Sequence, residues 1–109
     1  MRSGMHPTRT QETLVCRHFD GDWALYEEYL SACKAQFLID AQAGDAACTD
    51  LNGLPLLHRL AHSLKTVLQT LGYDVAAQQA RDVELACALQ DAMQARIHWT
   101  RVRHAILSV

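Results

Sequence analysis

The chain has 109 residues, of which half are hydrophobic and only 6% aromatic, and 12 acidic against 10 basic side chains give a formal net charge of −2. This length fits one domain with a modest core, and the interspersed charges form no basic stripe that would suit nucleic acid. No apolar run approaches the roughly 18 residues of a membrane span, and the N-terminus lacks a signal-peptide core, so we expect a cytoplasmic protein.

The first residues are polar and predict a mobile tail over 1–11, followed by one domain over 12–109. A short helix is expected at 12–19. Residues 20–22 (Asp-Gly-Asp) then break the chain and provide a carboxylate cap for the next helix. The apolar residues available for packing in the short helix are Leu14, Val15 and Phe19.

A long helix is predicted from Trp23, because apolar residues recur at steps of three and four. They are Trp23, Tyr26, Leu30, Cys33, Phe37 and Ala41. Gly44-Asp45 leaves two alternatives, a kink or end at that point or a further turn or two to Thr49. Residues 50–53 (Asp-Leu-Asn-Gly) have the composition of a turn and a cap.

The next helix has Pro55 in its first turn, where the missing N–H is tolerated, and ends at Gly72. Its apolar stripe comprises Leu57, Leu60, Leu64, Val67, Leu68 and Leu71. Asp74 is expected to cap a following helix with the inward residues Ala76, Ala80, Val83 and Cys87. A last helix is expected near Asp91, after a break that no glycine or proline marks, with Ala95, Trp99, Val102 and Ile106 inward.

Four sizeable amphipathic helices joined by short loops predict an all-α fold, an antiparallel up-down four-helix bundle with a short N-terminal helix. The four cysteines are widely spaced and form no C-x-x-C pair, so we expect small core residues rather than a disulfide framework or a zinc site. They are Cys16, Cys33, Cys48 and Cys87.

His62 is predicted to point away from the core, since each helical residue turns by about 100° and the leucine stripe faces inward. His58, Lys65 and Gln69 fall on the same outward line, and Arg59 lies on a nearby flank. An exposed neutral imidazole is a competent nucleophile, and a cation one turn away suits phosphoryl transfer, which needs positioning and charge compensation. A solvated surface histidine with no function fits the same spacing.

The segment 60–65 (Leu-Ala-His-Ser-Leu-Lys), with Gly72 ten residues after His62, resembles the H-x-L-K-G signature of histidine-containing phosphotransfer (HPt) domains. Residues 19–30 resemble the approach to the first long helix of that family. Glu84 lies 22 residues after His62, where the family commonly has Glu or Gln. The resemblance covers roughly residues 14–108.

This resemblance implies a phosphorelay carrier with no kinase activity of its own and no cofactor. His62 would exchange a phosphoryl group with the phosphoaspartate of a receiver domain, through Nε2. Lys65 would assist the phosphoryl group, and Glu84 would accept the Nδ1 proton and orient the ring. The implied partners are a response-regulator receiver domain, a hybrid sensor histidine kinase, or both, and the implied oligomeric state is a monomer.

The chain departs from the family at Thr66, which occupies the usual glycine position, and at residues 67–69, which replace residues that are usually small. Thr66 and Gln69, together with His58 and Arg59, are expected on the face that docks a receiver. The added bulk would either select a particular receiver or weaken transfer.

Two alternatives therefore stay open. The first is a non-catalytic HPt-like module that binds a receiver or kinase domain without carrying phosphate. The second is a metal site on His58 and His62, for which no third or fourth ligand is evident and no H-E-x-x-H motif exists.

Overall fold

The computed structural model describes residues 9–109, which form five helices and contain no strand, so the prediction of an all-α fold is confirmed. The helices are α1 (Arg9–Phe19), α2 (Trp23–Thr49), α3 (Leu54–Thr70), α4 (Asp74–Ala88) and α5 (Ala92–Leu107). Within this part of the chain, no helix has an apolar stretch of the length that crossing a membrane requires.

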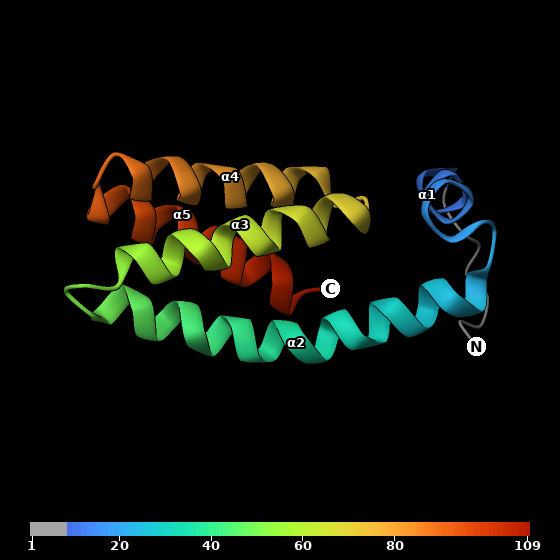
Figure 1. Cartoon of the computed structure of the whole chain (residues 1–109), viewed down its shortest axis with the longest axis horizontal. Helices are drawn as coiled ribbons and strands as arrows, with labels where there is room; N and C mark the ends of the chain where they lie inside the picture. The colour runs from blue at the N-terminus through green and yellow to red at the C-terminus, as the bar shows by residue number, and fades with distance from the viewer. Residues whose placement is uncertain (1–8) are drawn as a thin grey trace.

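Helices α3, α4 and α5 pack over the C-terminal part of the long helix α2 (Figure 1). Helix α3 contacts α2 and α4, and α5 contacts the same two helices. The buried leucine, alanine, valine and aromatic side chains of the five helices form one hydrophobic core. Its most fully buried large members are Val15, Tyr26, Phe37, Leu57, Leu64, Leu68, Val83 and Val102.

Helix α1 lies across the N-terminal end of α2 (Figure 1). It begins at Arg9, so the prediction of a tail through residue 11 is wrong for residues 9–11, and residues 1–8 lie outside the described residues. Glu12 in the first turn favours this earlier start, because a carboxylate near a helix N-terminus interacts with the helix dipole. The rings of Phe19 and Tyr26 meet edge to face at 5.5 Å and join the two helices.

The caps expected at Asp22 and Gly72 are present. The Asp22 carboxylate accepts a hydrogen bond from the Leu25 amide at 3.0 Å and starts α2. Gly72 has a φ of 81°, and the amide of Tyr73 donates to the Leu68 carbonyl at 2.9 Å, which completes the left-handed cap of α3.

The prediction that Asp74 caps α4 is wrong, because Asp74 is already the first residue of the helix and Tyr73 occupies the cap position without a side-chain cap bond. The α4–α5 turn repeats this geometry with Gln90, whose φ is 57°, in place of Gly72. At this turn Asp91 stands where Tyr73 stands in the α3–α4 turn. Its side chain caps α5 by accepting a hydrogen bond from the Gln94 amide at 3.1 Å. The break before α5 is therefore made by a non-glycine residue in the left-handed region.

Helix α2 continues through Gly44 to Thr49, the second of the two alternatives. Gly44 is buried, and the Trp99 indole packs where a Cβ would lie. The next residue, Asp45, accepts hydrogen bonds from Trp99 Nε1 at 3.0 Å and from Arg103 Nε at 2.8 Å. The glycine therefore allows α2 and α5 to approach closely, and it does not end the helix.

The four cysteines are unpaired, and the prediction of core positions holds only in part. Cys33 and Cys87 are buried and Cys48 is half-buried, whereas Cys16 is exposed. The core prediction for Cys16 is wrong because Leu14 and Val15 take the inward face of α1 and leave Cys16 on its outer side.

Replacing Gly44 by alanine should destabilise the fold by about 1–3 kcal/mol, because the added methyl group overlaps the Trp99 indole. The measurement is urea unfolding followed by circular dichroism. Ala43→Gly is the control at the exposed neighbouring position, where glycine should be the worse residue by about 1 kcal/mol. A higher unfolding midpoint for Gly44→Ala than for the native chain would contradict the packing described.

Candidate functional site

His62 lies in the middle of α3, with a side chain that is 64% exposed. The neighbours Ala61 and Leu64 are buried at 0% and 2% exposure, so the helix turns its apolar side inward and the imidazole outward. This is the orientation that the leucine stripe predicts, and it leaves the ring accessible to a second molecule.

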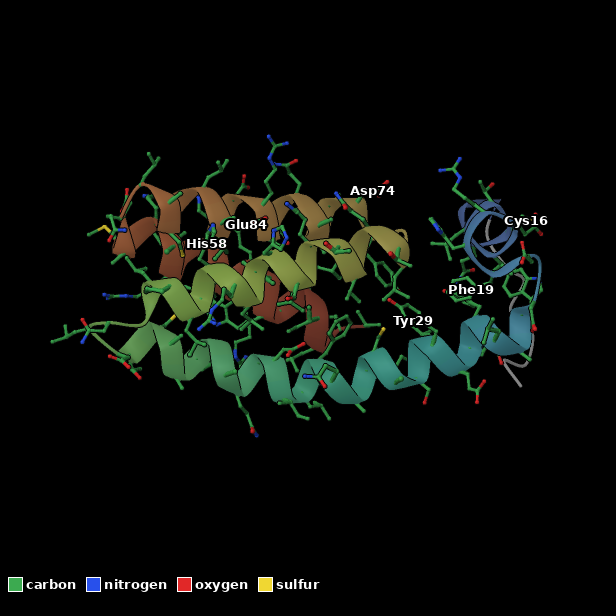
Figure 2. All side chains as sticks on the ribbon, in the orientation of Figure 1. Cys16, Phe19, Tyr29, His58, Asp74 and Glu84 are labelled. Carbon is green, nitrogen blue, oxygen red and sulfur yellow. The ribbon has the colours of Figure 1, made fainter. Side chains whose placement is uncertain are left out.

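Glu84, which is labelled in Figure 2, lies on α4. It connects His62 to the rest of the site. Its Oε2 lies 2.9 Å from His62 Nδ1, and its Oε1 lies 2.9 Å from Lys65 Nζ. The Glu84 side chain is only 13% exposed and that of Lys65 24%, so both groups of this ion pair are largely shielded. One carboxylate thus holds two side chains of α3 that are one helical turn apart.

The charge on Glu84 is maintained by these two neighbours. Burial alone would raise the pKa of its carboxyl group, but the hydrogen bonds and positive charges of Lys65 and His62 outweigh burial and lower the pKa. An ionised carboxylate only accepts hydrogen bonds, so His62 Nδ1 must be the donor. In the neutral ring the proton is then on Nδ1, and Nε2 presents an unprotonated lone pair.

Nε2 makes no hydrogen bond with any residue that the structure describes, and the exposed ring leaves room for a reacting group. The arrangement is that of a histidine with one nitrogen fixed and the other available. Glu84 orients the nucleophilic imidazole directly, much as a further residue orients the base that activates a nucleophile in other proteins.

The other predicted site residues surround His62 on two flanks of α3. On the flank toward α4 lie His58, which is half-buried, and Gln69, which is exposed. On the opposite flank Arg59 and Thr66 are both exposed. The Thr66 hydroxyl donates to the His62 carbonyl at 3.4 Å, so this residue is bonded to its own helix and adds its methyl group to the surface.

The metal alternative gains no further ligands from the fold. Among residues 9–109, no group of three or more histidine, cysteine, aspartate or glutamate side chains is placed to hold a metal ion. Nδ1 of His62 is moreover engaged by Glu84.

A groove of about 150 Å³ between α3 and α4 has Lys65, but not His62, in its lining. It is lined by Lys65, Gln69, Asp74, Ala77, Gln78 and Arg81. Sequence reasoning missed Arg81, which is three residues before Glu84 and therefore on a neighbouring part of the same helix surface. The signal that identifies it is the helical spacing from Glu84, once Glu84 is known to face α3.

A larger cavity of about 850 Å³ lies between the start of α4 and the end of α5. Its lining includes Tyr73, Val75, Arg101 and His104, but none of His62, Lys65 and Glu84. It is therefore separate from the histidine site.

Comparisons of the chain with protein-family models, with curated proteins and with solved structures find no match. The function of the site is accordingly inferred from the chemistry of the residues that α3 and α4 bring together.

Replacing Glu84 by glutamine should lower the free energy of unfolding by up to about 1 kcal/mol at neutral pH, because Lys65 loses its partner. The folded-state pKa of Glu84 lies below its ordinary value of 4.5, so its stabilisation is present above that value and is lost as the pH falls through the folded-state pKa. The difference between the native chain and Glu84→Gln should therefore shrink below about pH 4. Urea unfolding at a series of pH values measures it, and a constant difference down to pH 3 would contradict the charged bridge.

Proposed function

We propose that this chain is a phosphocarrier of the HPt class, in which α2–α5 form an antiparallel up-down four-helix bundle and His62 carries the phosphoryl group. The observation that supports the proposal most is the shared carboxylate of Glu84, which orients an exposed imidazole and pairs with the lysine one turn away. The carrier would take the group from a receiver-domain aspartate and pass it to another receiver in two-component signalling.

The chemistry is a transfer between two partners. The lone pair of Nε2 attacks the phosphorus of an aspartyl phosphate, an N–P bond forms, and the P–O bond to the donor breaks as the aspartate leaves as a carboxylate. The imidazole ring keeps its Nδ1 proton and becomes positively charged, and the adjacent Glu84 carboxylate stabilises that charge. The reverse sequence returns the group to an aspartate.

Lys65 supplies positive charge beside the reacting group. Its ammonium is a compact charge on a flexible stem, so it can turn from Glu84 toward phosphoryl oxygens without movement of the helix. Phosphoryl transfer requires little more than positioning and such charge compensation, and in this proposal the carrier needs no cofactor.

The resemblance to HPt domains adds independent support, because the residues that carry it are the ones the fold brings together. Glu84 is distant in sequence, yet it contacts both the histidine and the lysine of the H-x-L-K segment. The partners we propose are a response-regulator receiver domain, a hybrid sensor histidine kinase, or both, with the chain acting as a cytoplasmic monomer.

One observation favours a second candidate, a module that binds receivers or kinases without carrying phosphate. Thr66 is exposed one turn beyond His62 and adds a branched side chain to the surface that a partner must approach. Close approach would then be limited, and binding without transfer would remain.

Replacing His62 by glutamine should abolish phosphate uptake from a phosphorylated receiver and leave the fold intact, since the ring is exposed. The measurement is transfer of radiolabelled phosphate across a panel of receivers, with circular dichroism as the check on helical content. The native chain should acquire an acid-labile, alkali-stable label on His62. An unlabelled native chain that still binds a receiver would favour the non-catalytic module.

Replacing Lys65 by alanine should slow transfer to His62 by about tenfold or more, because one positive charge near the phosphoryl group is lost. Lys34→Ala is the matched control, since Lys34 is an exposed lysine on α2. Single-turnover transfer from one phosphorylated receiver measures both variants. Equal rates in the two would show that Lys65 plays no part.

A further inference from the structure

The His62 site has a charge imbalance once it is phosphorylated. Before transfer, the Lys65 ammonium and the Glu84 carboxylate cancel each other at 2.9 Å. The imidazole that attacks phosphorus is the neutral form, because nucleophilic attack requires the lone pair of Nε2. Phosphorylation adds a group with a charge of about −2 and leaves the ring with one positive charge. The three side chains and the phosphoryl group then sum to one negative charge, so the site lacks one cation.

Two arginines, each about one helical turn from a site residue, are the candidates for it. Arg59 is three residues before His62 on α3, and Arg81 is three residues before Glu84 on α4. Both are exposed, and neither forms an ion pair with another residue in the described part of the chain. Either guanidinium is therefore available to an incoming anion.

Their positions around the helices distinguish them. At about 100° per residue, Arg59 and Lys65 project roughly 60° to opposite sides of His62, and Lys65 is on the side of α4. Arg81 shares the α3–α4 groove with Lys65, and the amides of Gln69 and Gln78 line the same groove. The contact between Glu84 and Nδ1 holds the imidazole at the α3–α4 interface, beside Lys65.

We propose that Arg81 is a second phosphoryl-binding cation, which completes the charge balance of the phosphorylated site from α4 while Lys65 acts from α3. This inference rests on the proposed function, because it concerns the phosphoryl group on His62. A guanidinium can bind two phosphoryl oxygens at once, so Arg81 would also orient the group for transfer. Asp74 is the acidic residue in the lining of the groove. It is at the start of α4, about two helical turns from Arg81.

The test uses phosphoramidate, a small donor whose P–N bond breaks as ammonia leaves, so that no receiver has to dock. Native chain, Arg81→Gln, Arg81→Lys and Arg101→Gln are each incubated with the donor, and phosphohistidine is measured over time. Arg101→Gln is the matched control, because it removes the same charge from an exposed arginine on α5. Arg59→Gln reports on the opposite flank.

We expect Arg81→Gln to be phosphorylated about tenfold more slowly than the native chain. Arg81→Lys should recover part of the native rate, and Arg101→Gln should keep all of it. The rate for Arg81→Gln should also depend less on salt concentration. Equal rates for Arg81→Gln and Arg101→Gln would overturn the role of Arg81, as would a loss confined to Arg59→Gln. A native chain that takes up no phosphate at His62 would instead overturn the proposed function itself.

Discussion

The carboxylate of Glu84 is the group on which the candidate site depends. It reaches from α4 to α3 and contacts two side chains there, His62 through Oε2 and Lys65 through Oε1. A shift of one helix past the other by a single turn, about 5.4 Å, would break both contacts. The relative position of α3 and α4 is therefore part of the site, and the tight Gly72 turn between them helps to fix it.

A comparable polar contact joins the helices on another side of the fold. Asp45 of α2 accepts hydrogen bonds from Trp99 and Arg103 of α5, above the close approach at Gly44. Because α5 packs against α4 as well as against α2, this α2–α5 contact also helps to position α4. Preorganisation of this kind matters for transfer chemistry, where misplacement by about 1 Å is enough to slow a reaction strongly.

Local signals in the sequence predict much of this fold. The caps at Asp22 and Gly72, the start of α5 near Asp91 and the outward position of His62 follow from residue type and helical spacing. Two features are not decided by those signals. At Gly44 the sequence leaves both a helix end and a continued helix open, and the contact with Trp99 explains why glycine stands inside the helix. At Gln90 a local left-handed cap like that of Gly72 ends α4, and no glycine marks it in the sequence.

The candidate site shows the same division. Spacing along α3 suffices to group His62 with Lys65, and resemblance alone suggested Glu84. The Glu84 carboxylate contacts both residues only because α3 and α4 pack together, so the pattern of either helix alone does not predict these contacts. Arg81 was missed for this reason, since its relation to Lys65 exists only across the α3–α4 groove.

Nitrogen-15 NMR of the His62 ring, at a pH where the imidazole is neutral, reports directly on the tautomer that Glu84 imposes. We expect a protonated Nδ1, held by Glu84, and an unprotonated Nε2 that is ready to attack phosphorus. A ring with the proton mainly on Nε2 would contradict it, because the exposed nitrogen would then lack the lone pair on which phosphoryl transfer depends.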